Sequence, residues 1–596
     1  MRSVLLVISL LFVSGGCYHL LIVENLRIEF LKLHSEIVKS VSNNDTLRHD
    51  IRLILHDYKP FLIRLKKVEQ DVLNYDFIIN SNKLNNNIRN HFESIYNTTI
   101  NINSKKRYNE NNFKDGIKRF NYTRILQDFR NKTNKQTYFY SFLEKIDKTT
   151  LEQYSKHELC FILYQYLTLT DIKGLILTSL FEFTTNNSSI PLKLPPVAKY
   201  NNILLSLGNI PDDIWRQDPA NHKKGKTYIE IEKFLQAVIV YEKHMYPFNC
   251  KNECIDYKNV TSIKNDCGQQ FNEMAFNCKS IVDTYHRTQL LNCHEVSPTL
   301  TTCRDTFPRI YKYSKFGNQI YGDNSGCTQK EQTFTTNKGC SYCVCTMYYK
   351  RYSAKYISLR SVTSTIDKNR IIVGARFQKH NNLIHIQIKE GILGPYLTIN
   401  ETRWVKIENF KYNDRLIHQN QDFIQISMNK RSIHLGAAKL SHVDDKYINI
   451  ENYVLTGVRF HEWQGFLLLQ IRCTRFDLKS GALIANGSGW YDVNSWPSNE
   501  IEINNSDIPR DGGTSKIVSR GDNQFVSFTH SSFETDFAQT TVPFFDAQEV
   551  VSSSPLHGMG IYYKRELKNG NRKSGGFLGI KLFTYDYKDH LRKLTN

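Results

Sequence analysis

After its first residues the sequence has no apolar run long enough to span a membrane, which takes about 20 residues. It also lacks a complete catalytic motif. Three His-Glu pairs begin at His157, His294 and His461, but none is followed by the second His, four residues after the first, that a zinc peptidase helix requires. We therefore expect no enzymatic activity, metal site or cofactor. An unrecognised hydrolase, with catalytic residues scattered along the chain, is the alternative.

Acidic residues are too few to balance the basic ones. The chain has 78 Lys and Arg against 58 Asp and Glu, and its formal net charge is +20. In an exported protein this excess favours acidic partners, such as anionic glycans, phospholipid surfaces or acidic proteins. A solvated basic surface without a partner is the alternative. Export argues against nucleic acid as a partner.

The first residues have the order of a secretory signal peptide. Arg2 precedes the apolar stretch Val4–Val13, and the small residues Ser14–Gly16 follow. The apolar stretch is short for a membrane span, and an uncleaved N-terminal anchor is the alternative. We expect a signal peptide over residues 1–17 and a secreted, extracellular protein without a transmembrane anchor.

Cysteines are sparse outside one region. Of the 13, ten lie between Cys250 and Cys345, and removal of Cys17 with the signal peptide leaves an even number. In an oxidising compartment such clustering indicates a disulfide framework, so we expect a stapled connector over residues 246–345. The segment "CSYCVC" has the residue types of a zinc site, but export favours disulfides. Spacing does not give the connectivity of the candidates Cys160, Cys250, Cys254, Cys267, Cys278, Cys293, Cys303, Cys327, Cys340, Cys343, Cys345 and Cys473.

Ten Asn-x-Ser/Thr sequons also fit export. Some arise by chance in an Asn-rich chain, but several are expected to carry glycans. The glycosylation candidates are Asn44, Asn97, Asn121, Asn131, Asn186, Asn187, Asn259, Asn400, Asn486 and Asn504.

Residues 18–245 are predicted to form a helical domain. Apolar residues at three-to-four spacing give amphipathic stripes over 19–41 and 50–73, where Pro60 is expected to break or kink the helix. The most apolar stretch, 150–183, is expected to form two packed helices that meet near Thr168–Asp171. A further helix is predicted over 227–246.

From about residue 350 the apolar pattern has a period of two. The segments 371–389 and 454–472 are nearly the same, and each reads as strand, short turn and strand with one apolar face. A fainter third copy covers 556–587, and a candidate strand precedes each copy. Copies that cannot bury their own faces close around a shared core. We therefore expect a three-repeat β domain over 346–596, best fitted by a prism of three antiparallel sheets, with a two-sheet sandwich as the alternative. The fold class is α+β multidomain.

Exposed aromatic residues and one tripeptide are the binding candidates of the β domain. Trp463, Trp490 and Trp496 fall in or near turns, where they can stack on sugar rings or anchor a protein partner; capping of the β core is the alternative. Arg520-Gly521-Asp522 is a tripeptide that can bind integrins from an exposed loop, and an ordinary turn is its alternative.

Several segments carry a resemblance to known proteins: "CSYCVC", "YISLRSVTS", "VLTGVRF", "FTHSSFETDFAQTTVPFFDAQEVV" and "GFLGIKLF". They resemble an uncharacterised family of secreted arthropod proteins, mostly insect, whose C-terminal half is a domain of unknown function. The resemblance covers roughly 335–585, and "AQTTVPFFDAQ" (538–548) is its most specific part. It implies no catalytic residues. More distantly, the three-fold pattern is similar to the β-prism of vitelline-membrane outer-layer proteins and jacalin-type lectins.

These observations favour a secreted glycoprotein without enzymatic activity. We expect a binding or structural component of the extracellular space, found in haemolymph, saliva, venom or matrix, with a lectin-like β domain. Its partner is expected to be an extracellular glycan or protein. The alternative from another class is a membrane-active effector that works through the basic helical half and its apolar segment 160–181.

Overall fold

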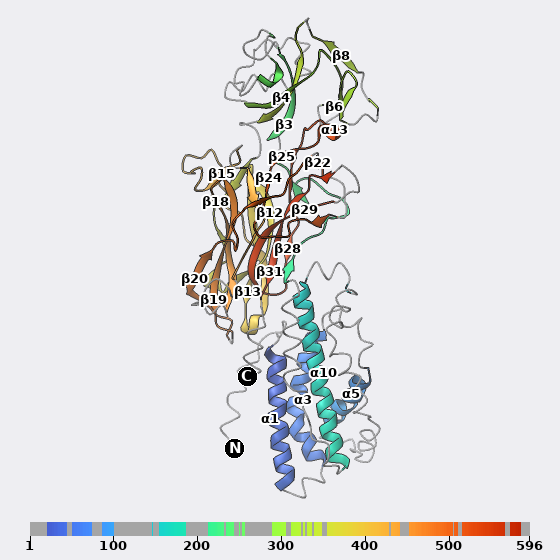
Figure 1. Ribbon diagram of the computed structural model, residues 1–596. Coiled ribbons are helices and arrows are strands. Elements are labelled where there is room, and N and C mark those ends of the chain that lie inside the picture. Colours follow the sequence, from blue (N-terminus) through green and yellow to red (C-terminus); the bar gives the residue numbers. More distant parts are fainter. Residues whose placement is uncertain are drawn as a thin grey trace.

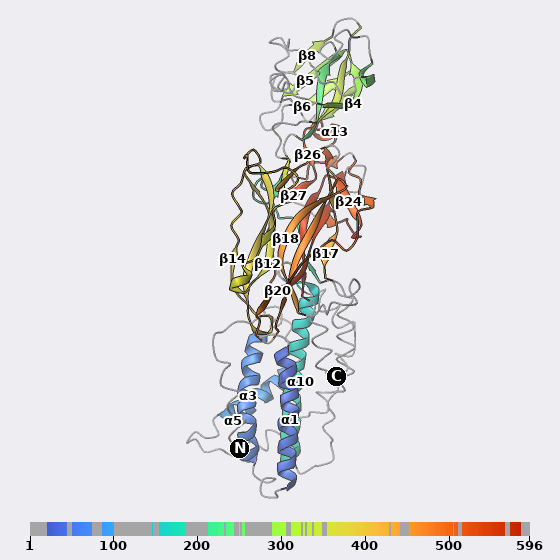
Figure 2. The ribbon, with the colours of Figure 1, turned by 90° about the vertical axis from the view of Figure 1, so that its left-hand side faces the viewer.

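The computed structural model has three parts in a row: helices at one end, a β domain in the middle and a small Cys-rich β domain at the other end (Figure 1, Figure 2). It describes residues 21–43, 51–73, 86–100, 146, 154–185, 212–231, 234–242, 250, 253–256, 289–304, 311–322, 326–327, 331–336, 339–348, 355–427, 431–440, 452–478, 480–504, 506–509, 515–566 and 573–585. The predicted signal peptide therefore lies outside the described residues. No described helix is long and apolar enough to cross a membrane.

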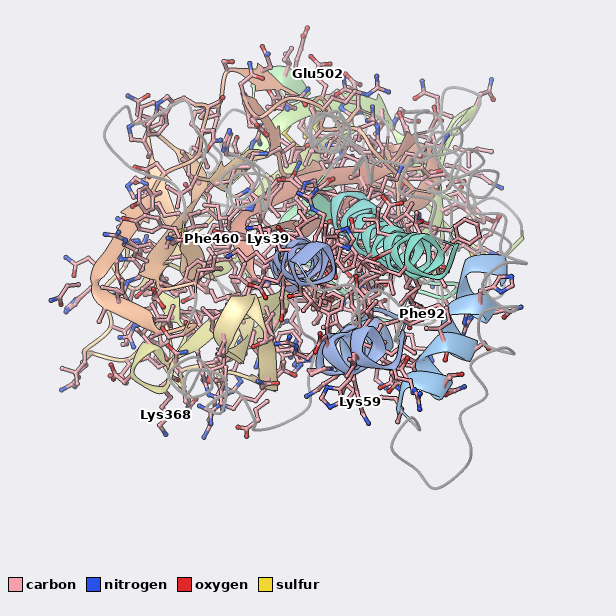
Figure 3. The ribbon with its side chains drawn as sticks, turned by 90° about the horizontal axis from the view of Figure 1, so that it is seen from below. Lys39, Lys59, Phe92, Lys368, Phe460 and Glu502 are labelled. Carbon is pink, nitrogen blue, oxygen red and sulfur yellow. A yellow bond between two sulfur atoms is a disulfide. The ribbon has the colours of Figure 1, made fainter. Side chains whose placement is uncertain are left out.

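Among the described residues, four helices lie at one end: α1 (Leu21–Asn43), α3 (Ile51–Leu73), α5 (Asn86–Ile100) and α10 (Lys156–Thr185). The amphipathic stripes of α1 and α3 are confirmed, since Phe30 and Tyr58 are buried in one shared core. Phe92 of α5 lies in the same core, as the view from below shows (Figure 3). Pro60 lies inside α3 and does not end it. Burial of its neighbours Phe61 and Leu62 offsets the missing backbone hydrogen bond.

The two helices predicted over 150–183 are one. α10 runs through Thr168–Asp171 without interruption, and every residue from Thr168 to Leu180 is buried. The polar residues that suggested a turn are accommodated within the helix: the hydroxyl of Thr170 donates to the carbonyl of Tyr166 at 2.9 Å. A helix buried on all sides is the central helix of its bundle.

The predicted strand–turn–strand segments are three long antiparallel hairpins. They are β12 (Arg370–His380) with β13 (Leu383–Leu393), β18 (Tyr453–Trp463) with β19 (Phe466–Phe476), and β29 (Leu556–Arg565) with β31 (Phe577–Thr584). Each lies in a different sheet, which we call the first, second and third sheet in this order. The register of each hairpin shifts just before an equivalent glycine: Gly374, Gly457 or Gly558. A Cβ atom there would come within 2.9, 2.9 or 2.5 Å of a neighbouring strand.

Short strands connect the three sheets in a ring. β10 (Tyr356–Ser358) pairs with β13 in the first sheet, and β11 (Val362–Thr363) pairs with β18 in the second. β16 (Ser432–His434) then pairs with β19 in the second sheet, and β17 (Ala437–Lys439) with β29 in the third. Finally, β27 (Phe544–Asp546) pairs with β31 in the third sheet, and β28 (Val550–Val551) with β12 in the first. The three sheets enclose one core that contains Phe377, Phe460 and Ile561.

Shorter elements complete the β domain. They are β1 (Asp213–Ile214), β14 (Ile399–Trp404), β15 (Phe423–Gln425), β20 (Leu483–Tyr491), β21 (Asn499–Glu500), β22 (Ser506–Asp507), β23 (Lys516–Ile517), β24 (Gln524–Ser527), β25 (Thr529–His530), β26 (Thr541–Val542), β30 (Lys573–Ser574) and the short helix α13 (Phe533–Asp536).

The helix predicted over 227–246 is wrong, because this segment forms two strands. β2 (Tyr228–Ile229) pairs with β27 in the third sheet. β3 (Leu235–Tyr241) pairs with β9 (Tyr342–Tyr348) of the Cys-rich domain. Val238, Ile239 and Val240 are β-branched, a residue type that favours strands over helices.

The Cys-rich region folds into two small sheets. β3, β9 and β4 (Gln289–Ser297) form one, and the other consists of β5 (Thr299–Arg304), β6 (Tyr311–Phe316), β7 (Gln319–Gly322) and β8 (Gln332–Thr335). Disulfides rather than a metal hold "CSYCVC". The bonds are Cys250–Cys340, Cys254–Cys343, Cys293–Cys345 and Cys303–Cys327.

The disulfide prediction fails for Cys473, which is a buried free thiol. Its position on β19 points it into the shared core of the β domain, where burial raises its pKa. Cys267 and Cys278 lie outside the described residues, as does the side chain of Cys160.

Glu158 joins the helices to the β domain. Ser155 caps α10: its hydroxyl accepts a hydrogen bond from the backbone nitrogen of Glu158 at 3.0 Å and lies 2.8 Å from the hydroxyl of Thr584. The carboxyl group of Glu158 accepts hydrogen bonds from the hydroxyls of Ser553, at 2.8 Å, and Ser554. Burial raises the pKa of Glu158 to about 7, although these hydrogen bonds favour the charged form.

This joint should weaken as the pH rises. The pKa of Glu158 is about 7 in the folded chain and ordinarily 4.5, so the folded state retains a proton that the unfolded state releases. Glu158 makes its full contribution to the free energy of unfolding below pH 4.5 and has lost that contribution by about pH 7. The free energy of unfolding falls by about 3 kcal/mol over this interval. Glu158→Gln keeps an acceptor for both serines and cannot titrate. The melting temperature of the wild type should therefore fall relative to that of the variant across this interval.

Glu36→Gln, on the exposed side of α1, is the matched control and should keep the pH profile of the wild type. Parallel profiles for the wild type and Glu158→Gln would contradict the assignment.

Candidate functional site

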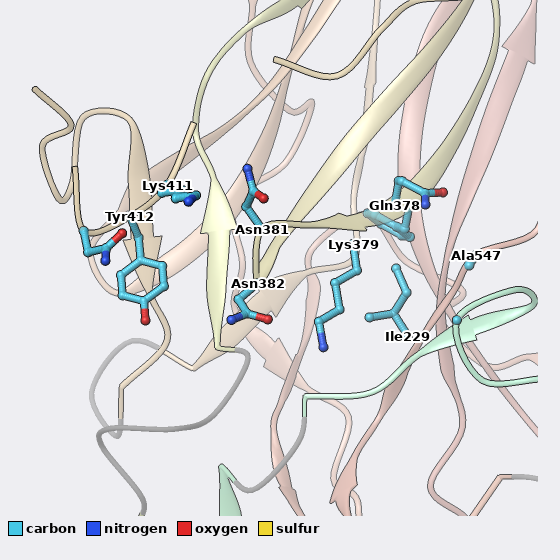
Figure 4. A pocket seen from close by; sticks show the side chains of 11 residues that line it. Ile229, Gln378, Lys379, Asn381, Asn382, Lys411, Tyr412 and Ala547 are labelled. Atoms are coloured by element: carbon cyan, nitrogen blue, oxygen red, sulfur yellow. The ribbon is translucent and has the colours of Figure 1, made fainter. Parts of the chain in front are cut away.

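A pocket of 580 Å³ opens beside the turn of the first hairpin. Its lining combines the end of β12 with that turn, a loop after β14, the segment that contains β2, and the residue after β27. We call it the turn pocket, and it is lined by Gly225, Ile229, Phe377, Gln378, Lys379, Asn381, Asn382, Lys411, Tyr412, Asn413 and Ala547. Figure 4 places Lys379 and Asn382 between Tyr412 on one side and Ile229 and Ala547 on the other.

The sequence of the hairpin turn shapes one wall of the turn pocket. Asn381 and Asn382 have φ values of 49° and 63°, which Asn tolerates in a two-residue hairpin turn. The amide of Asn381 donates to the side-chain oxygen of Asn409 at 2.7 Å and to the carbonyl of Phe410 at 3.1 Å. These bonds hold the loop that carries Tyr412 against the turn.

The turn pocket offers hydrogen-bonding groups and one aromatic face. Among the described residues that line it, Lys379 and Lys411 are charged and none carries a carboxylate. The Tyr412 ring is stacked on that of Tyr356, with centroids 4.0 Å apart and planes 16° apart, so its orientation is fixed. Amides, ammonium groups and a fixed aromatic ring suit a ligand rich in hydroxyl or anionic groups. The sequence prediction did not include these residues, because the lining comes from four separate stretches.

Two of the predicted tryptophans lie together at the turn of the second hairpin. The Trp463 and Trp496 ring centroids are 4.4 Å apart. Trp496 is 47% exposed, so this pair has a face available for stacking. This turn of the second hairpin corresponds to the turn of the first hairpin, which borders the turn pocket. Stacked aromatic rings lie beside each of the two turns.

Trp490 belongs to a different arrangement, on the outer face of the second sheet. The Arg459 guanidinium lies 4.3 Å from its ring centroid and donates to the side-chain oxygen of Gln470 at 2.7 Å. The first sheet repeats this stack with Arg376 at 4.4 Å from Trp404. The repeated Arg in the two copies was the sequence signal for it.

The Arg520-Gly521-Asp522 tripeptide lies in a turn before β24. Arg520 is exposed, and Gly521 and Asp522 are half-buried. The backbone nitrogens of Arg520 and Gly521 donate to the side-chain oxygen of Gln524 at 2.7 and 3.0 Å. The carbonyl of Asp522 lies 2.7 Å from Nε2 of His434, so the turn is anchored to β16.

The remaining sequence candidates lie apart from the turn pocket. Asn97, Asn400, Asn486 and Asn504 are exposed, and the other six sequons fall outside the described residues. The three His-Glu pairs start on different elements, in α10, β4 and β18. Within the described part of the chain, no three His, Cys, Asp or Glu side chains are grouped so that they could hold a metal ion.

A family model matches part of the chain. Residues 197–388 match a family model described as a domain of unknown function (DUF4803). The match includes the Cys-rich domain and most of the first hairpin, and it lies further toward the N-terminus than the segment 335–585 that carried the resemblance. No curated protein matches the chain.

The two kinds of tryptophan should differ in their effect on stability. Trp490→Ala removes a ring that stacks on Arg459 and covers Gly457, and we expect a loss of about 2 kcal/mol and a lower melting temperature. Trp496→Ala should cost less than about 1 kcal/mol, because the ring is half in solvent. Thermal unfolding of both variants measures the difference, and equal effects would contradict it.

Proposed function

We propose that this protein is a secreted, non-enzymatic glycoprotein that serves as a binding or structural component of the extracellular space, in haemolymph, saliva, venom or matrix. Four disulfides among the described residues favour an oxidising compartment. The exposed sequons are accessible to glycosylation. The expected partner is an extracellular glycan or protein.

We further propose that the β domain is a three-repeat β-prism. The ring of strand pairings supports this, because each hairpin pairs with a short strand from another copy. The similar position of the register shift in all three hairpins also supports it. The likeness to prism lectins concerns the fold, so it does not by itself assign a ligand.

The turn pocket carries the proposal of a lectin-like role. It combines amide and ammonium donors with the fixed ring of Tyr412, the groups that orient a sugar through its hydroxyls and apolar face. The Trp463–Trp496 pair at the neighbouring turn supplies a second aromatic surface.

A glycan-array screen of the oxidised, full-length protein at low and high salt tests this role. We expect binding to a defined set of sugars that persists at high salt, because hydrogen bonds and stacking are not screened as charges are. Tyr412→Ala should weaken this binding about tenfold, equivalent to about 1.4 kcal/mol.

Two lysine variants separate the turn pocket from the net charge. Lys411→Ala changes the lining, whereas Lys368→Ala removes the same charge from an exposed site at the other end of β12. Binding that disappears at high salt and responds equally to both variants would reflect only the basic surface. No binding by the folded protein would contradict the lectin-like role and favour a protein partner.

A membrane-active effector is the second candidate. The buried position of α10 makes insertion into a membrane energetically costly. The segment 160–181 lies within this central helix, and its residue Lys173 is buried in an ion pair with Glu69. Membrane insertion therefore requires α10 to leave the bundle and this pair to separate. Leakage of anionic liposomes on addition of the full-length protein would support this function, and intact liposomes at micromolar protein would remove it. An unrecognised hydrolase remains the third candidate.

A further inference from the structure

The third sheet contains a lysine enclosed by two aspartates. Nζ of Lys564, on β29, lies 2.6 Å from Oδ2 of Asp546 and 3.1 Å from Oδ1 of Asp218. Nζ also donates to the carbonyl of Arg216 at 2.8 Å. The side chains of Lys564, Asp218 and Asp546 are 0%, 2% and 4% exposed. Three charges are thus removed from water at one point.

The three residues come from separate parts of the chain. Asp546 ends β27, which is separated from β29 by β31, so Lys564 and Asp546 meet across the strand between them. Asp218 comes from the segment between β1 and β2. Aromatic rings surround the cluster. The centroid of the Phe577 ring lies 5.7 Å from Nζ of Lys564, and the His222 ring stacks on that of Phe577 with the centroids 4.5 Å apart.

Charge is costly in this buried cluster. Two carboxylates and one ammonium are removed from water, and Nε2 of His222 lies 3.9 Å from Oδ1 of Asp218. Transfer of the ammonium proton to a carboxylate converts the close ion pair into an amine and a carboxylic acid. A neutral lysine in an apolar pocket is a nucleophile. Because it is held beside a carboxyl group, the two groups do not have to meet by diffusion before they react.

The hydrogen bonds distinguish the roles of the two aspartates. Both oxygens of Asp546 accept hydrogen bonds from Gln548, from the backbone nitrogen at 3.0 Å and the side-chain amide at 3.2 Å. Donors aimed at a carboxyl group stabilise negative charge that develops on its oxygens during attack. Asp218 is held through its other oxygen by the backbone nitrogen of Ser515 at 3.1 Å. Among the described residues, its Oδ1 accepts no hydrogen bond, although it lies beside Nζ.

We propose that Lys564 and Asp546 form an intramolecular amide bond, with Asp218 as the proton carrier. In the proposed step the Lys564 ammonium first passes one proton to the Asp546 carboxylate, and the resulting amine attacks Cγ of that carboxyl group. Asp218 takes a proton from the nitrogen and delivers it to a hydroxyl group of the tetrahedral intermediate. The carbon–oxygen bond breaks, one water leaves, and a secondary amide remains. The step needs no oxidant or co-reactant, and it ties β27 to β29 across β31.

Mass spectrometry of the intact full-length protein, denatured, reduced and deglycosylated, tests the proposal. We expect a mass lower by one water than the sequence requires. Proteolysis should release one branched peptide that contains positions 546 and 564, and fragmentation should locate the bond between them. A wild-type protein of full mass that gives two separate peptides overturns the proposal and leaves a buried ion pair.

Two near-isosteric variants test the assigned roles. Asp218→Asn leaves Lys564 paired with Asp546 but removes the proton carrier, so the folded variant should keep its full mass. Asp546→Asn keeps an attackable carbonyl and should form the same bond with loss of ammonia in place of water. Circular dichroism and the disulfide pattern identify folded protein. A branched peptide in Asp218→Asn at the wild-type level overturns the role of Asp218.

Discussion

None of the three long hairpins can bury its own apolar face, and the β domain is organised around this constraint. Each hairpin takes strands from another part of the chain, and the last connection, from β28 back to β12, joins residues far apart in sequence. The third sheet also includes β2, which precedes the Cys-rich domain. The third sheet is therefore completed by a segment that precedes the Cys-rich domain, and such long-range pairing makes folding slow compared with local contacts.

The sequence predicts those features that depend on neighbouring residues. The hairpins follow from strict alternation, and the stripes of α1 and α3 from helical spacing. Prediction fails where distant partners decide the outcome. Thr168–Asp171 reads as a turn until the surrounding bundle buries this part of α10 on all sides. The segment 235–241 reads as a helix until β9 pairs with it. The turn pocket and the Lys564 cluster lie beyond such reasoning, because each combines stretches that have no relation in sequence.

The stretch 538–548, the most specific part of the resemblance, lies where the parts of the molecule meet. The carbonyl of Ala538 accepts a hydrogen bond from the nitrogen of Ala237 in the Cys-rich domain at 2.9 Å. Phe545 contributes to the β core, and Asp546 to the Lys564 cluster. Residues 538–547 are all buried. Packing at a joint therefore explains their types, and one of them, Ala547, also lines the turn pocket.

The segment 212–231 connects this joint to the turn pocket. Asp218 fixes the segment to the third sheet through Lys564, while Gly225 and Ile229 form one wall of the turn pocket. The opposite wall belongs to the hairpin of the first sheet. The pocket thus lies at a seam between two sheets, and its shape depends on how firmly the segment is held. A covalent bond at Lys564 would reduce the freedom of the strand against which this wall packs, and a more rigid wall lowers the entropy lost when a ligand binds.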